Sequence, residues 1–134
     1  MNKFRKVLTG LAMAVILTGF TVMSVSAQTD ATTLAASLSS GSISSSAAFT
    51  SGANSIVNGY VTAVGAVTLG ANSLVTGNVT AGAAFTSGAN SVISGNVNSA
   101  GDVTLGAASK ILGYVHSGTG VINYGAGATV GWVK

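Results

Sequence analysis

Few side chains in this chain are suited to acid–base or metal chemistry. The carboxylates are Asp30 and Asp102, the one histidine is His116, and there is no cysteine among the 134 residues. General acid–base catalysis, glycoside cleavage and the binding of hard metal ions all draw on several carboxylates or histidines. No metal-ligand spacing, phosphate-binding loop or catalytic serine motif is present. We therefore expect a protein that is not an enzyme and that uses neither a cofactor nor a metal.

Hydroxyl groups form the first candidate binding surface, because four threonines recur at intervals of eighteen residues. They are Thr50, Thr68, Thr86 and Thr104, each with a small residue nearby. Evenly spaced hydroxyl and methyl groups on a flat, rigid face would match a periodic solid such as ice, or a polysaccharide. Threonine is also a common residue on the exposed side of a strand, where it binds nothing. Both interpretations stay open on the sequence alone.

Aromatic residues form the second candidate surface. Tyr60, Tyr114 and Trp132 fall in one column of the same eighteen-residue register. Exposed aromatic rings commonly contact carbohydrate or a partner protein. Trp132 belongs to the final repeat, so the alternative is that it packs over the end of the fold.

Both the threonine column and the aromatic column belong to a sequence repeat that spans residues 41–133. Glycine recurs every eighteen residues, and a β-branched residue follows each glycine two places later. The pairs are Gly41 and Ile43, Gly59 and Val61, Gly77 and Val79, Gly95 and Val97, Gly113 and Val115, and Gly131 and Val133. Such self-similarity is typical of a solenoid, in which each coil buries its apolar face against its neighbours.

Each repeat divides into three short strands, as in Ala66–Ala83, where apolar and polar residues alternate between Gly, Asn and Ser turns. The density of glycine and β-branched residues argues against a helix. We expect an all-β, single-domain parallel β-helix of five to six coils, about 25 Å long. Its inner rows would be the β-branched row given above, a row of Val57, Val75, Ile93, Ile111 and Val130, and a row of Phe49, Val67, Phe85, Val103 and Val121.

The first 40 residues differ from this repeat. Residues 1–27 combine Lys3, Arg5 and Lys6 with an apolar run and a Val25-Ser26-Ala27 ending, which predicts a secretory signal peptide. Residues 28–40 would form a short capping helix or, alternatively, a disordered linker, and residues 41–134 the solenoid. Cleavage would leave a nearly neutral chain without a membrane span, which gives no basis for binding nucleic acid.

The repeats resemble two families. The segment GNVTAGAAFTSGANSVISGNV (77–97) resembles the bactofilins, bacterial proteins whose triangular, right-handed β-helices stack end to end into filaments. The segment AVGAVTLGANSLVTGNV (63–79) resembles the β-helical part of secreted bacterial ice-binding proteins. Both resemblances imply a right-handed solenoid. The bactofilins act inside the cell, whereas this chain carries an export signal.

The sequence therefore predicts a secreted structural solenoid in the extracellular space, at the cell surface or in the periplasm. Its expected partner is itself, through end-to-end or lateral stacking, because the ends of an open solenoid leave unpaired strand edges. The alternative function is binding of ice or polysaccharide by the flat Thr/Ala face.

Overall fold

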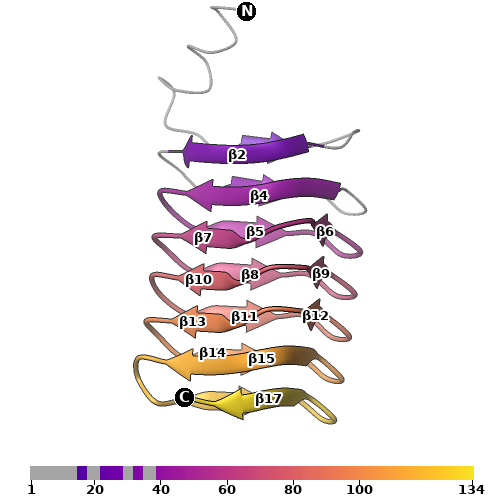
Figure 1. The fold of residues 1–134 in the computed structure, drawn as a ribbon, viewed down its shortest axis with the longest axis vertical. Helices are drawn as coiled ribbons and strands as arrows, with labels where there is room; N and C mark the ends of the chain where they lie inside the picture. Colours follow the sequence, from indigo (N-terminus) through magenta and orange to yellow (C-terminus); the bar gives the residue numbers. More distant parts are fainter. Residues whose placement is uncertain (1–14, 18–21, 29–31, 35–38) are drawn as a thin grey trace, which may run out of the picture.

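The computed structural model describes residues 15–17, 22–28, 32–34 and 39–134, and it shows a parallel β-solenoid (Figure 1). The described chain winds through about 5 turns whose equivalent residues are ~18 apart. Val79 pairs in parallel with Val61 on one side and with Val97 on the other. Residues eighteen apart are therefore direct neighbours, and the predicted architecture is confirmed.

The strands line three faces of the coil. The first face is a seven-stranded sheet in the order β1 (Val15–Leu17), β3 (Thr32–Leu34), β5 (Phe49–Ser51), β8 (Val67–Leu69), β11 (Phe85–Ser87), β14 (Val103–Leu105) and β16 (Ile122–Tyr124). The second face contains β6 (Ile56–Val57), β9 (Leu74–Val75) and β12 (Val92–Ile93). The third face contains β7 (Val61–Ala63), β10 (Val79–Ala81) and β13 (Val97–Ser99).

Two long strands join the second and third faces into one ten-stranded sheet. They are β4 (Ser39–Ser45), which pairs with both β6 and β7, and β15 (Lys110–Ser117), which pairs with both β12 and β13. The outermost strands of this sheet are β2 (Val22–Gln28), beside β4, and β17 (Thr129–Val133), beside β15. At each end of this sheet, the outermost strand therefore pairs with one of the two long strands: β2 with β4, and β17 with β15.

Alternation along each short strand builds the core. In β8, Val67 and Leu69 are buried while Thr68 between them is exposed. The β-branched row is fully buried from Ile43 to Val115, and the row from Val57 to Ile111 is at most 1% exposed. The third inner row differs from the prediction at its end, because Ile122, not Val121, pairs with Val103. The turn at 118–121 holds one extra residue, so Val121 is shifted to the outside and is 42% exposed.

Serine fills inner positions that the sequence pattern does not single out. One buried column near a corner consists of Ser55, Ser73, Ser91 and Ser109. Three of these hydroxyls donate to the carbonyl of a glycine in the preceding coil: Ser73 to Gly52, Ser91 to Gly70 and Ser109 to Gly88. A buried hydroxyl is tolerated when it is hydrogen-bonded, so these serines tie successive corners together.

The amino-terminal part of the chain continues the sheets. The short helix predicted within 28–40 falls mainly on residues 29–31 and 35–38, which lie outside the described residues. Thr32–Leu34, between those two segments, forms β3 and pairs with Phe49–Ser51. Within the predicted signal peptide, residues 22–27 belong to β2.

Ala108, at one corner, has a left-handed backbone conformation that is unfavourable for alanine, and this leads to a prediction about stability. Asn54, Asn72 and Asn90 adopt φ of 57–58°, and Ala108 takes the same place in the next coil with φ 56°. Asparagine tolerates this left-handed conformation, whereas alanine is strained by about 1 kcal/mol. Ala108→Asn or Ala108→Gly should therefore stabilise the protein by up to about 1 kcal/mol, measured by denaturant unfolding. Asn90→Ala should have the opposite sign, and a loss of stability in Ala108→Gly would contradict the argument.

Candidate functional site

The four threonines form a straight ladder on the first face. Thr50 pairs with Thr68, Thr68 with Thr86, and Thr86 with Thr104, all in parallel register. Thr50, Thr68 and Thr104 are exposed, and Thr86 is partly exposed. At the same register position Thr33 precedes the ladder and Asn123 follows it. Thr33 is seventeen residues from Thr50, so the eighteen-residue spacing alone does not find it. The result is a single row of hydroxyls along the solenoid.

The aromatic residues lie along one corner, where side chains link neighbouring coils. The Asn78 Oδ1 atom accepts a hydrogen bond of 2.9 Å from the Asn96 backbone N–H, and Asn96 Oδ1 accepts one of 2.9 Å from the Tyr114 N–H. Ser42 Oγ accepts in the same way from the Tyr60 N–H at 3.3 Å. The column therefore stabilises the stack, and it separates Tyr60 from the other two aromatic residues.

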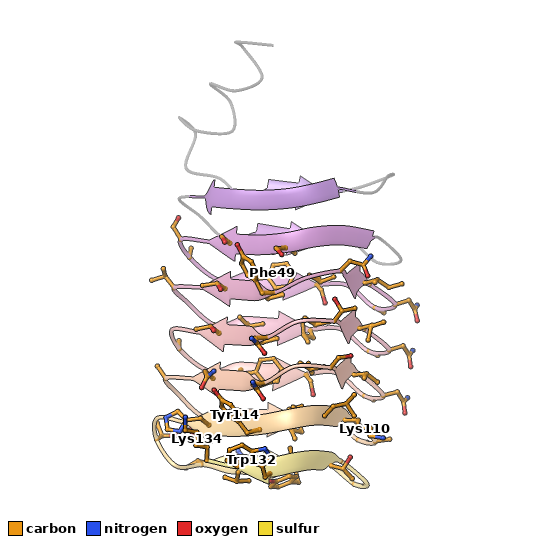
Figure 2. All side chains as sticks on the ribbon, viewed as in Figure 1. Phe49, Lys110, Tyr114, Trp132 and Lys134 are labelled. Atoms are coloured by element: carbon orange, nitrogen blue, oxygen red, sulfur yellow. The ribbon has the colours of Figure 1, made fainter. Side chains whose placement is uncertain are left out.

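Tyr114 and Trp132 do come together near the carboxyl-terminal end (Figure 2). Their ring centroids are 5.2 Å apart with an interplanar angle of 57°, and the Lys134 Nζ lies 5.1 Å from the Tyr114 centroid. Asn98 Nδ2 donates to the Tyr114 hydroxyl at 3.2 Å. Trp132 remains 58% exposed. This cluster is an aromatic surface with one adjoining cation.

The acid–base residues of the solenoid are engaged in separate contacts. Asp102 accepts a short hydrogen bond from the Thr119 hydroxyl, and His116 Nδ1 lies 3.1 Å from the Lys134 carbonyl oxygen. Among the residues that the structure describes, no group of three His, Cys, Asp or Glu side chains is positioned to hold a metal ion. No helix in that part of the chain is long and apolar enough to cross a membrane.

The carboxyl-terminal coil exposes positions that are buried in the coils between Ile43 and Ser117. Val133 is 54% exposed, although Val115, Val97 and Val79 in the same row are 0% exposed. Tyr124 pairs with the buried Leu105 and is itself 49% exposed. Within the described chain, β16 and β17 are the last strands of their sheets, so one edge of each is unpaired. Trp132 packs against Tyr114 and leaves this apolar end open.

Sequence spacing identified Val133 and Trp132 but missed Ile122 and Tyr124. These two residues occupy inner register positions of β16, opposite Val103 and Leu105. The signal for them was a spacing of nineteen residues in place of eighteen, caused by the longer turn before the strand. Together with Val130 and Val133 they form what we call the terminal face: Ile122, Tyr124, Val130 and Val133.

Comparisons with protein-family models, with curated proteins and with solved structures found no match for this chain.

Proposed function

We propose that this chain is a secreted, non-enzymatic structural protein that assembles end to end by stacking solenoids, at the cell surface or in an extracellular matrix. The observation that carries the proposal is the terminal face. Val133 is 54% exposed in a row that is completely buried from Ile43 to Val115. An apolar row that stops at an open end is completed most simply by another coil of the same circumference.

The backbone supports the same conclusion. Soluble β-proteins usually protect an edge strand with charged residues or proline, because an unprotected edge pairs with other chains. Neither Ile122–Tyr124 nor Thr129–Val133 contains a charged residue, and the whole chain has no proline. The two strands themselves therefore lack the usual barriers to pairing, and the charged Lys134 lies just beyond the end of β17. Stacking would add ladder hydrogen bonds between the two copies. It would also gain about 1.5–3 kcal/mol for each large apolar side chain that becomes fully buried.

The resemblance of residues 77–97 to bactofilin repeats supports stacking as the mode of assembly, and the amino-terminal leader supports its location outside the cytoplasm. The leader-free chain carries Lys110 and Lys134 against Asp30 and Asp102. Copies with so little net charge repel one another weakly, which favours association.

Substitution at the terminal face tests this function. In Val133→Asp, stacking would bury an unpaired carboxylate, so the concentration needed for assembly should rise by roughly 100-fold or more. The unfolding free energy of the monomer should change by only about 0.5 kcal/mol, because the side chain is half exposed there. Sedimentation and negative-stain electron microscopy of the leader-free protein would measure assembly.

Val64→Asp is the matched control. Val64 is 68% exposed between β7 and β8, away from both ends. The same change of charge there should leave end-to-end fibres intact. A wild-type protein that stays monomeric at high concentration, or a Val133→Asp protein that assembles as well as Val64→Asp, would reject end-to-end stacking through this face.

Binding of ice or polysaccharide is the second candidate, and the in-register threonine ladder favours it. The hydroxyls repeat at the strand spacing of about 4.8 Å along one face of the seven-stranded sheet. If this face binds ice, the leader-free protein should reshape ice crystals and produce thermal hysteresis, and Thr68→Lys should reduce both. A wild-type protein that leaves crystal shape and freezing point unchanged would remove the ice hypothesis.

A further inference from the structure

The opposite end of the solenoid is covered by the chain's own leader. Strand β2 (Val22–Gln28) pairs in parallel with β4, and the partners are Val22 with Ser40, Ser24 with Ser42, and Val25 with Ile43. Strand β1 pairs in the same way with β3. In the full chain, the amino-terminal edges of β3 and β4 are therefore occupied (Figure 1).

The predicted cleavage site falls inside this covering strand. Cleavage after Ala27 would remove all of β1 and every residue of β2 except Gln28. The amino-terminal edge of β4 (Ser39–Ser45) would then lose its partner. This edge contains no proline or charged residue to protect it, so processing would convert a paired end into an unpaired one.

The leader strands hold the same register positions as the strands of the terminal face. Following the inner rows along the stack, Val22 and Val25 of β2 stand where Val130 and Val133 of β17 stand at the other end. On the first face, Val15 and Leu17 of β1 correspond to Ile122 and Tyr124 of β16. All four leader positions are apolar, and the terminal face has three aliphatic residues and the aromatic Tyr124.

From this correspondence we infer that the leader occupies the docking edge for a second copy, and that its removal switches assembly on. The second copy presents β17 to β4 and β16 to β3, with its Val133 opposite Ile43. A precursor that folds before export covers its own docking edge and stays monomeric. This inference rests on the proposed end-to-end stacking. It adds which strands meet between two copies and how removal of the leader would control assembly.

A comparison of precursor and processed chain tests the inference. The full chain, purified without export, should need at least tenfold more protein to form fibres than chain 28–134 purified from a secreting host. The buried apolar residues of the described side chains run from Ile43 to Val115, so cleavage leaves this core in place. Sedimentation measures the threshold, and electron microscopy separates fibres from amorphous aggregates.

Strand-breaking variants of the leader add a control within the full chain. In the row of Val25 the backbone N–H donates to the following coil, as the Ile43 N–H does to the Tyr60 carbonyl. Val25→Pro removes this donor from β2 and disfavours pairing with β4, so it should lower the assembly threshold towards that of the processed chain. Val25→Thr keeps the N–H and the β-branched shape and should behave like the unmodified precursor. A full chain that forms fibres as readily as chain 28–134, or equal thresholds for the two variants, would overturn the leader's role while leaving end-to-end stacking standing.

Hydrogen exchange examines the cap without relying on assembly. At concentrations where all forms are monomeric, the backbone amides of β4 that face β2 should exchange at least tenfold faster in chain 28–134 and in Val25→Pro than in the full chain. The Ile43 N–H, which donates to the Tyr60 carbonyl in the next coil, should stay protected in all forms. Unchanged protection of β4 would show that the leader does not cover this edge. Absence of fibres from every form would instead reject the proposed function, and the inference with it.

Discussion

Replacing Gly88 with alanine should cost about 3 kcal/mol of stability, at the upper end of what overpacking usually causes. The reason is the close approach of neighbouring coils at the corner. A Cβ atom at Gly88 would lie 2.5 Å from both the Ala71 backbone nitrogen and the Gly70 carbonyl carbon. Both contacts are to backbone held in the ladder, so neither can move aside at low cost. Denaturant unfolding monitored by circular dichroism would measure the loss.

Gly127→Ala is the matched control, because it makes the same chemical change where there is space. Gly127 has φ 72°, and a Cβ there would meet nothing closer than the Ala108 Cα at 3.9 Å. Only the left-handed backbone is strained, at a cost of about 1 kcal/mol. Gly88 itself does not have a left-handed backbone, so equal losses in the two variants would contradict contact between coils as the reason for the glycine at position 88.

The damage from Gly88→Ala should also be local. Each coil of a solenoid contacts only its neighbours, so stability is close to a sum of coil and interface contributions. We expect amide protection to fall in the strands next to the corner, β8, β11 and β14, and to stay near its original level in β17. Uniform loss of protection along the whole chain would contradict this localisation.

The eighteen-residue glycine and valine rows were sufficient to predict the fold. A coil of constant circumference places residues such as Val61, Val79 and Val97 side by side, and period-two alternation then decides which residues face inward. The prediction failed where the circumference changed. One extra residue before β16 moved Val121 out of the core and put Ile122 in its place, and no repeated residue type marked that shift.

Buried serines and the pairing of β2 show a second limit of prediction from the sequence. Composition suggests that serine is a surface residue, yet Ser91 is 0% exposed and donates to the Gly70 carbonyl. That bond depends on the approach of two coils, which a linear pattern does not give. Likewise, the leader motif predicts export, but pairing of Val25 with Ile43 depends on where the first coil ends. The positions of Thr50 and Trp132 were predictable from the eighteen-residue register, whereas binding of a ligand by either residue stays a prediction.

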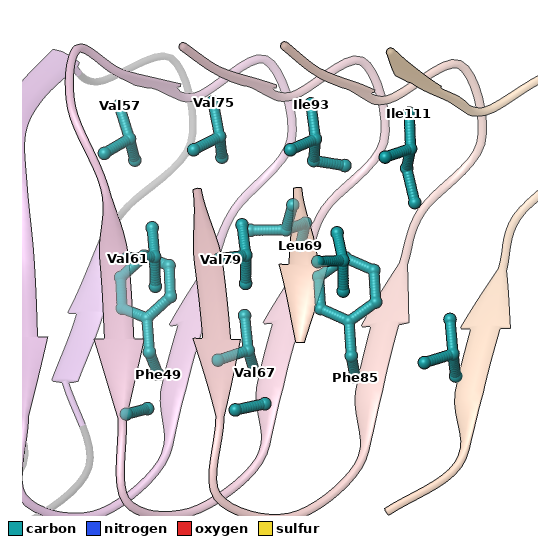
Figure 3. Packing of buried hydrophobic residues seen from close by; sticks show 14 of the residues in the cluster. Phe49, Val57, Val61, Val67, Leu69, Val75, Val79, Phe85, Ile93 and Ile111 are labelled. Carbon is teal, nitrogen blue, oxygen red and sulfur yellow. The ribbon is translucent and has the colours of Figure 1, made fainter. Parts of the chain in front are cut away.

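Core packing shows why two kinds of coil alternate. Phe85 and Ser87 face inward from β11, whereas Val67 and Leu69 occupy the equivalent places in β8. The larger side chain therefore changes rows from one coil to the next, and Figure 3 shows the Phe85 ring among the aliphatic side chains of this core. The same alternation returns in β5 and β14, with Phe49 and Ser51 and then Val103 and Leu105. A constant cross-section is kept by pairing a large residue with a small one.

Phe85→Ala should accordingly lower the free energy of unfolding by about 3–5 kcal/mol, because Phe85 is 0% exposed and its removal leaves a cavity. The neighbouring Thr86→Ala, on the outside of the same strand, should cost about 1 kcal/mol or less. Denaturant unfolding of both variants beside the wild type would measure the difference. Similar losses for the two would mean that the inner row does not carry the stability assigned to it.

The double variant Phe85→Val with Ser87→Leu tests the alternation itself, since it converts β11 to the inner pair found in β8 and β14. Loss of the Ser87 hydroxyl leaves its polar neighbours with other partners. The Gly106 N–H donates to the backbone carbonyl of residue 87 at 3.0 Å, and the Ser109 hydroxyl donates to the Gly88 carbonyl at 2.7 Å. Leucine should therefore refill part of the space left by the phenyl ring. We expect the double variant to be more stable than Phe85→Val alone by about 1 kcal/mol. If Ser87→Leu instead adds to the loss of stability caused by Phe85→Val, the two inner rows are filled independently. Packing would then not explain the alternation of the two kinds of coil.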